Sequence, residues 1–238
     1  MDPNPFVNPG LVWAGLKARY GEQGRVQIID FLAPPAAAEA TALAKTQLPW
    51  VLHYRDAGQT KEISERDLLA MSVAERQAFL ARLDAFARED FQFAYFGCSL
   101  TPDNLVQFEA GHPIRAVAAR LVTREFVDLM GALIGDPAVR GLTASLTRYD
   151  PGQYLLPHDD TDGKDDRRAA FVLNLSEDWW PDWGGLLQFI DDERNVIASF
   201  TPHNNSMAVF KVPQFHAVSY VTPHALRSRY AITGWVIA

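Results

Sequence analysis

Two histidines and one aspartate stand at positions that could bring them together around a metal. Asp160 follows His158 by two residues, and His216 comes much later in the chain. Two imidazoles and one carboxylate on separate strands can occupy one face of an Fe(II) ion and leave the opposite face open to small molecules. We therefore interpret His158, Asp160 and His216 as a candidate metal site, and its open face as the place for oxygen chemistry.

The carboxylate of this set has a competitor in the neighbouring Asp159. Successive side chains of an extended segment point to opposite sides, so we expect His158 and Asp160 to share a side and Asp159 to point away. The pair His-x-Asp is by itself a weak pattern. Its weight comes from Gly152, from the adjacent Gly184 and Gly185, and from a late histidine and arginine. The other histidines are interpreted as surface or hydrogen-bonded residues; they are His53, His112, His203 and His224.

An arginine beyond the second histidine could bind a co-substrate. The planar guanidinium of Arg229 offers two parallel donors to a carboxylate. Arg227 has the same parity along an extended chain, so alternation does not separate the two. We favour Arg229 because it immediately precedes the apolar segment 230–235, and Arg227 remains the alternative.

The second half of the chain has the pattern of a β-rich core. After Gly141, short runs rich in β-branched and aromatic residues alternate with Gly, Pro, Asp and Asn, which is typical of a sandwich or jelly roll. We predict strands at 143–149, 169–175, 186–189, 196–200, 207–211, 216–221 and 230–237. We interpret most charges of segment 159–168 as a solvated loop. Trp179, Trp180 and Trp183 could border a substrate opening or pack as loop anchors.

The first half is mixed, and helices dominate it. The spacing of Ser72 and Glu75 is that of a capping box, and apolar residues behind it recur at helical intervals, which predicts a helix over 73–88. We also predict helices at 34–45, 113–121 and 123–134, strands at 25–30, 50–54 and 91–96, and a polar turn at 56–58. The first 20 residues, with Pro3, Pro5 and Pro9, are expected to form an irregular arm.

Length and charge narrow the function classes. A chain of 238 residues is long enough for one domain, which we divide into helix-rich support over 1–140 and a core over 141–238. The net charge of −7 disfavours nucleic acid as a partner. No apolar run reaches bilayer length, so we expect no membrane segment. One cysteine, Cys98, and no evident signal segment favour a cytoplasmic location. The oligomeric state is left open.

Five motifs together resemble a known family. In order they are 149-Tyr-Asp-Pro-Gly, 158-His-Asp-Asp, 184-Gly-Gly-Leu-Leu, 216-His-Ala-Val and 229-Arg-Tyr-Ala-Ile-Thr-Gly-Trp. They cover about 90 residues and resemble the 2-oxoglutarate/Fe(II)-dependent dioxygenases of the prolyl hydroxylase type. The resemblance implies an α+β fold with a mainly β core, a double-stranded β-helix of the jelly-roll or cupin-like kind, supported by N-terminal helices.

The resemblance also implies roles for single residues. His158, Asp160 and His216 would be the catalytic iron ligands, and Arg229 would bind the distal carboxylate of 2-oxoglutarate. Tyr149 would donate a hydrogen bond nearby, and Trp235 would line the pocket. Asn174 stands where some prolyl hydroxylases have a tyrosine that binds the co-substrate. Its amide can still donate to a carboxylate, but it is shorter.

The activity implied is hydroxylation of a prolyl residue in a protein or peptide, with O2 consumed, 2-oxoglutarate converted to succinate and CO2, and ascorbate as a possible reductant. The nearest alternative is hydroxylation of a free amino acid or small metabolite. Demethylation of nucleic acid fits the acidic charge less well. A non-enzymatic cupin-like metal-binding module is a further alternative, and succinate production would distinguish it from an oxygenase.

Overall fold

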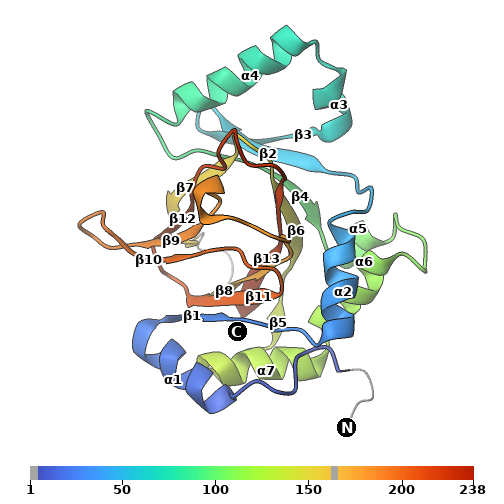
Figure 1. Cartoon of the computed structure of the whole chain (residues 1–238), viewed down its shortest axis with the longest axis vertical. Coiled ribbons are helices and arrows are strands. Elements are labelled where there is room, and N and C mark those ends of the chain that lie inside the picture. Colours follow the sequence, from blue (N-terminus) through green and yellow to red (C-terminus); the bar gives the residue numbers. More distant parts are fainter. Residues whose placement is uncertain (1–4, 162–165) are drawn as a thin grey trace.

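A computed structural model describes residues 5–161 and 166–238. Within these ranges, thirteen strands form one antiparallel sheet that curls into a nearly closed barrel (Figure 1). The strands are β1 Arg25–Ile28, β2 Val51–Asp56, β3 Gln59–Ser64, β4 Phe93–Ser99, β5 Gly141–Leu142, β6 Ser145–Tyr149, β7 Tyr154–His158, β8 Arg167–Asn174, β9 Leu187–Ile190, β10 Val196–Phe200, β11 Ser206–Lys211, β12 His216–Val218 and β13 Arg229–Ile237.

The strand order explains how distant motifs meet. Along the sheet it is β1-β11-β8-β13-β6-β4-β7-β12-β9-β10, with β2 joined to β4, β3 joined to β2, and β5 joined to β13. The strands that carry the two histidines, β7 and β12, are neighbours. The predicted double-stranded β-helix is confirmed. Four strands of the first half, β1 to β4, pair into the same sheet as the second half.

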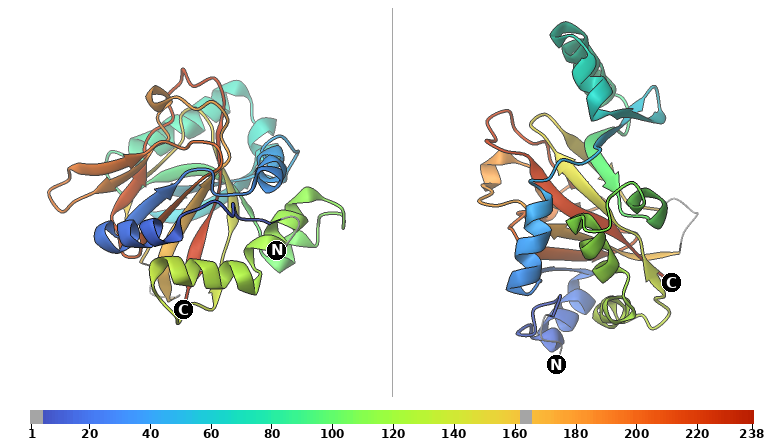
Figure 2. Two further views of the ribbon diagram at one scale, coloured as in Figure 1. Left: turned by 60° about the horizontal axis from the view of Figure 1, so that its bottom comes forward. Right: turned by 90° about the vertical axis from the view of Figure 1, so that its right-hand side faces the viewer.

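Helices cover part of the outside of the barrel. They are α1 Trp13–Gln23, α2 Pro34–Leu43, α3 Glu65–Ala70, α4 Val73–Phe86, α5 Pro102–Leu105, α6 Pro113–Leu121 and α7 Arg124–Ile134, with a short 3-10 turn at Pro181–Trp183. Figure 2 shows α2, α6 and α7 along one side of the sheet, while α4 projects beyond its end. The covered side contains the main core, in which Phe31, Leu43, Leu52 and Ile114 are fully buried.

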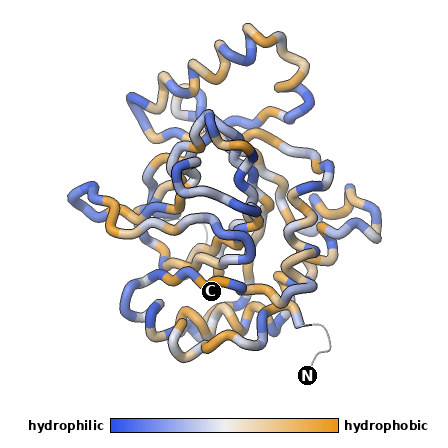
Figure 3. The backbone as a smooth tube through the Cα atoms, in the orientation of Figure 1, coloured by the Kyte–Doolittle hydropathy of each residue, from blue (hydrophilic) through white to orange (hydrophobic). Residues whose placement is uncertain are grey.

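The distribution of hydrophobic residues agrees with this arrangement of barrel and covering helices. In Figure 3 the hydrophobic stretches of the chain concentrate in the barrel strands and in the helices packed on them, and hydrophilic stretches lie at the turns. No helix in the described part of the chain is long and apolar enough to cross a bilayer.

The irregular arm expected for the first 20 residues is partly wrong: residues 5–12 are irregular, residues 13–20 belong to a helix, and residues 1–4 lie outside the described ranges. Residues Trp13–Gln23 form helix α1, which packs on β1 and α7 and ends at Gly24 in the left-handed conformation. The three prolines all precede this helix, so they do not interrupt its hydrogen bonds. Gly24, directly after the last helical residue, was the sequence signal for the C-terminal end of α1.

Most other predicted elements are confirmed, with ends shifted by a few residues. The capping box of α4 is present: Ser72 Oγ accepts from the Glu75 backbone N–H at 3.2 Å, and the Glu75 carboxylate accepts from the Ser72 N–H at 2.9 Å. The sequence analysis predicted no strand at the positions of β3 and β5. The loop expected over 159–168 is partly wrong, since Arg167 and Arg168 begin β8. Residues 162–165 of that segment lie outside the described ranges.

Gly184 provides a test of the fold. It has φ of +69°, and a Cβ there would overlap the backbone carbonyl of Tyr220. We expect Gly184→Ala to lower the free energy of unfolding by more than about 2 kcal/mol, because it adds a clash to an unfavourable backbone conformation. Gly21, inside α1, faces open space. Gly21→Ala should leave stability unchanged or raise it by up to about 1 kcal/mol. Urea unfolding of both variants measures the difference, and equal effects would contradict this account.

Candidate active site

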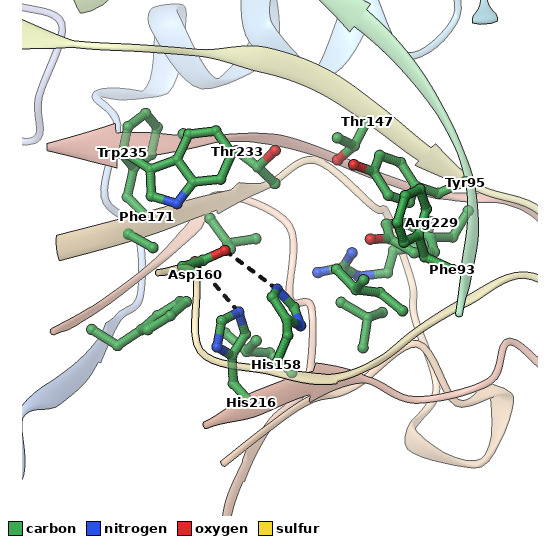
Figure 4. Close-up of a pocket in the computed structure, with 18 of the residues that line it drawn as sticks. Phe93, Tyr95, Thr147, His158, Asp160, Phe171, His216, Arg229, Thr233 and Trp235 are labelled. Atoms are coloured by element: carbon green, nitrogen blue, oxygen red, sulfur yellow. Dashed lines mark ion pairs between the residues drawn. The ribbon is translucent and has the colours of Figure 1, made fainter. Parts of the chain in front are cut away.

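The barrel encloses one cavity that contains most of the residues singled out by sequence. Its volume is about 230 Å³. Figure 4 shows the candidate metal ligands at one end and Arg229 at the other. Polar groups enter it from His158, Asp160, His216, Arg229, Tyr149, Tyr95, Thr147, Thr233 and Trp235, and the remaining wall is mainly apolar.

The two histidines face each other across neighbouring strands. His158 ends β7 and His216 begins β12, and the register of these strands pairs the two residues directly. Their ring centroids lie 4.2 Å apart. His158 Nε2 is 3.3 Å from Asp160 Oδ1, and His216 Nε2 is 3.6 Å from Asp160 Oδ2. One nitrogen or oxygen from each side chain lies within 4.8 Å of the others, so the three can share one metal ion.

Backbone carbonyls set the tautomer of both rings. His158 Nδ1 lies 3.0 Å from the carbonyl oxygen of Leu156, and His216 Nδ1 lies 2.7 Å from that of Gln214. A carbonyl oxygen only accepts, so each Nδ1 carries the hydrogen and donates it. Both Nε2 lone pairs therefore face Asp160 and are available to a metal, an arrangement common among metal-binding histidines.

The protonation states of His216 and Asp160 also favour metal binding. Burial and the adjacent His158 imidazole lower the pKa of His216 to about 4, so its ring is neutral near pH 7. Burial alone would raise the pKa of the Asp160 carboxyl. The neighbouring imidazoles of His158 and His216 outweigh burial, and the pKa of Asp160 lies below its usual range. A neutral imidazole and an ionised carboxylate are the forms that bind divalent metals.

Asp160 does not lie in an extended segment, so the strand alternation expected to select it over Asp159 is wrong. Asp160 has φ of +66°, so the chain turns there and is not extended. This turn, and not strand alternation, brings its carboxylate to the histidines. Asp159 faces away, and its carboxylate accepts hydrogen bonds from the backbone and hydroxyl of Thr161.

Arg167 supports the turn at Asp160. Its Nη1 donates to the backbone carbonyl of Asp160 at 3.0 Å. Its guanidinium stacks over the indole of Trp235, 3.8 Å from the ring centroid. The indole nitrogen of Trp235 in turn points toward Asp160 (Figure 4). These contacts hold an uncommon backbone conformation and the carboxylate that it presents.

At the other end of the cavity lies a buried cation. The side chain of Arg229, only 1% exposed, enters from the start of β13. Its Nη2 donates to Asn174 Oδ1 at 3.3 Å, and its guanidinium lies 5.2 Å from the ring centroid of Tyr149. Its Nε has no hydrogen-bond partner, and within residues 5–161 and 166–238 no carboxylate pairs with it. Burial lowers the pKa of Arg229, and Tyr149 partly offsets this effect.

The remaining sequence candidates lie in different places. Trp235 and Tyr149 line the cavity, and burial raises the pKa of the Tyr149 phenol, which stays protonated as a potential donor. Asn174 lies behind Arg229 and does not line the cavity. Arg227 is on the surface, where it is 3.6 Å from Asp178.

The tryptophans near the glycine pair serve mainly as packing. Trp179 and Trp183 are buried, cross edge-to-face, and pack in one cluster with Tyr149. Trp180 is 65% exposed. None of the three lines the cavity, so Trp179 and Trp183 act as loop anchors that support Tyr149 from outside.

Comparison with known proteins agrees with this geometry. Residues 144–237 match the family model described as 2OG-Fe(II) oxygenase superfamily. A segment of 107 residues is 35% identical to the prolyl 3-hydroxylase sudestada1 of Drosophila melanogaster; it covers 40% of this chain and 19% of that protein. The resemblance to 2-oxoglutarate/Fe(II)-dependent oxygenases of the prolyl hydroxylase type is confirmed. The matched segment spans about a fifth of the length of sudestada1.

Solved structures share the fold over nearly the whole chain. A prolyl-4-hydroxylase from Pseudomonas putida superposes with a TM-score of 0.57 at 19% identity, covering 100% of this chain and 99% of that one. A prolyl hydroxylase from Trichoplax adhaerens, solved with a peptide fragment of hypoxia inducible factor, gives a TM-score of 0.59 at 17% identity, covering 95% and 89%. At these identities the likeness establishes the fold of the barrel.

Sequence analysis missed the aromatic wall of the cavity. Phe91 and Phe93 are 5.8 Å apart, Phe93 and Tyr95 are 5.7 Å apart, and Tyr95 stacks on Tyr149 at 5.2 Å. All four line the cavity. The alternation of aromatic residues over 91–95 was visible, but only the pairing of β4 with β6 and β7 turns that face inward.

The contacts of Arg167 predict an effect on the candidate metal site. Arg167→Ala should weaken metal binding about tenfold or more, because the turn that presents Asp160 loses its support. Its neighbour Arg168, which pairs with Asp136 and Asp166 on the surface, gives a matched control. Mn(II) affinity, measured by calorimetry for Arg167→Ala and Arg168→Ala, checks the expectation. Equal affinities would show that Arg167 does not support the ligand.

Proposed function

We propose that this chain is an Fe(II)- and 2-oxoglutarate-dependent dioxygenase that hydroxylates a prolyl residue in a protein or peptide, with succinate and CO2 as the other products. One observation carries the proposal. A buried guanidinium, which has no carboxylate partner among the described residues, shares a cavity with two imidazoles and a carboxylate. A buried unpaired cation is costly, and a carboxylate ligand such as 2-oxoglutarate would compensate it.

The donor set fits Fe(II). His158 and His216 would each supply Nε2, and Asp160 one carboxylate oxygen, which is the ligand type and number that leave positions open for exogenous molecules. When bound, Fe(II) would supply the activation of O2 that hydroxylation requires. We also propose O2 as a substrate and ascorbate as a possible external reductant.

Protein groups around the metal ligands would bind and orient the co-substrate. Arg229 would bind the distal carboxylate through its two-donor edge, and the protonated phenol of Tyr149, which lines the same region, would donate a hydrogen bond. Aromatic side chains from β4 and apolar ones such as Leu187 and Val218 would exclude water from the reacting groups. Trp235 lines the metal end of the cavity, with its indole nitrogen directed toward Asp160.

The proposed substrate class is a polypeptide. A free amino acid carries its own carboxylate and would need a second cation, and Arg229 is the one cation among the described residues that line the cavity. Arg148 faces the other side of β6, where it pairs with Glu65 at 2.6 Å and Asp150 at 3.0 Å. Lys211 ends β11 on the surface. A prolyl residue within a peptide is neutral and needs no second cation.

We also propose the partner class, location and domain organisation of the chain. The net charge of −7 supports a partner other than nucleic acid. We propose a cytoplasmic location on the basis of the cysteine content, and one domain in which 1–140 supports the core at 141–238.

Mass spectrometry tests the activity and the substrate class together. Proline-containing peptides, free L-proline and pipecolate would each be incubated with protein, Fe(II), ascorbate and 2-oxoglutarate, with His216→Ala as the inactive control. We expect a mass gain of one oxygen on a peptide, matched by succinate. Coupled hydroxylation of a free amino acid, with all peptides unchanged, would transfer the assignment to a small-molecule hydroxylase. Metal binding without succinate from any substrate would favour a cupin-like binding module.

The two arginines give a separate prediction. Arg229→Ala should raise the KM for 2-oxoglutarate about tenfold or more, consistent with losing about 1.5–3 kcal/mol of charged hydrogen bonding. Arg229→Lys should restore little, because an ammonium does not reproduce the two-donor edge. Arg227→Ala, on the surface, should leave KM within about twofold. Steady-state kinetics on the three variants decides the matter, and the opposite ranking would assign the role to Arg227.

A further inference from the structure

A chain of buried hydrogen bonds runs behind Arg229, away from the cavity. Arg229 Nη2 donates to Asn174 Oδ1 at 3.3 Å, and Asn174 Nδ2 donates to Ser206 Oγ at 3.1 Å. Asn174 lies on β8 and Ser206 on β11, and the register pairs these two residues directly. Their exposed fractions are 3% and 0%. These hydrogen bonds thus link the candidate co-substrate site to two neighbouring strands.

The hydroxyl of Ser206 can only accept from Asn174. Ser206 Oγ donates its one hydrogen to the backbone carbonyl of His203 at 2.7 Å. It also receives Gln27 Nε2 from β1 at 3.4 Å, and the same Gln27 amide donates to the carbonyl of Thr201 at 2.7 Å. With its hydrogen already used, the Ser206 oxygen offers lone pairs to the Asn174 amide.

This arrangement determines which end of the Asn174 amide meets Arg229. Because the NH2 group is held by Ser206, the carbonyl end must face the guanidinium. The sequence-based expectation that Asn174 donates to a carboxylate is therefore not met by the side chain as it lies. Asn174 accepts from Arg229, and its NH2 group points away from the cavity.

We propose that Asn174 and Ser206 form a positioning relay, which orients Arg229 toward a carboxylate in the cavity while leaving its charge uncompensated. The inference rests on the proposed function, since 2-oxoglutarate is the carboxylate concerned. A neutral amide oxygen fixes one Nη without cancelling the positive charge. An ionised side chain at the same position would form an internal ion pair and compete with the co-substrate.

Binding of 2-oxoglutarate tests the relay without turnover. Calorimetric titration of Mn(II)-loaded protein with 2-oxoglutarate gives affinity for the parent chain, Asn174→Asp, Ser206→Ala and Arg229→Ala. We expect Asn174→Asp to weaken binding at least about thirtyfold, since the new carboxylate pairs with Arg229. Ser206→Ala should weaken it about three- to tenfold, because the amide loses the acceptor that orients it.

A double variant separates positioning from general loss of structure. If Ser206 acts through Arg229, Ser206→Ala in the Arg229→Ala background should change the affinity for 2-oxoglutarate less than twofold. Mn(II) affinity and the thermal midpoint, measured on every variant, report damage to the fold. Gln77→Glu on the exposed face of α4 repeats the charge change far from the cavity and should bind as the parent does.

The outcomes of these affinity measurements distinguish the relay from the proposed function on which it rests. Parent-like affinity in both Asn174→Asp and Ser206→Ala, with binding lost in Arg229→Ala, would overturn the relay and leave the oxygenase proposal intact. No binding by the parent chain, or equal binding by parent and Arg229→Ala, would instead overturn the proposed role of Arg229. If Asn174→Asp does not fold, Ser206→Ala and the double variant still decide the relay.

Discussion

The direct pairing of His158 with His216 across β7 and β12 is the constraint on which the site depends. The register places the two rings side by side, tilted by 48° with centroids 4.2 Å apart, and backbone carbonyls at Leu156 and Gln214 turn both Nε2 atoms toward the same point. A shift of one residue in this ladder would move a histidine to the outer face of the barrel. The neighbours β9 and β4 hold β12 and β7 on their other edges, so the histidine geometry is a property of the whole sheet.

The second element of the site is an uncompensated charge. Arg229 is among the largest fully buried side chains, and its described hydrogen-bond partner is a neutral amide. Burying a cation in this way lowers stability, so the fold must hold it by other means. Pairing of β13 with β6 on one edge and β8 on the other provides that support. The same arrangement makes the cavity complementary to an anion, which links the energetic cost to the proposed use.

Sequence reasoning succeeded where residue identity and local pattern were sufficient. The capping box at Ser72, the left-handed Gly135 after α7 and the alternating strands of the second half all follow from local chemistry, and all are present. It failed where a local signal was weighed wrongly, as for the prolines before α1. It also chose Asp160 by an alternation argument that does not apply, since the chain turns at that residue.

The sequence by itself determined the types of chemistry available: two imidazoles, a carboxylate and a late arginine, in an order that resembles a known oxygenase family. The tertiary structure decided which members converge. It placed Arg229 inside and Arg227 outside, although they share a parity, because only Arg229 begins β13 between β6 and β8. It also moved Asn174 behind Arg229 and brought Phe91, Phe93 and Tyr95 to the cavity. These outcomes depend on strand pairing between distant segments, which no single stretch of sequence encodes.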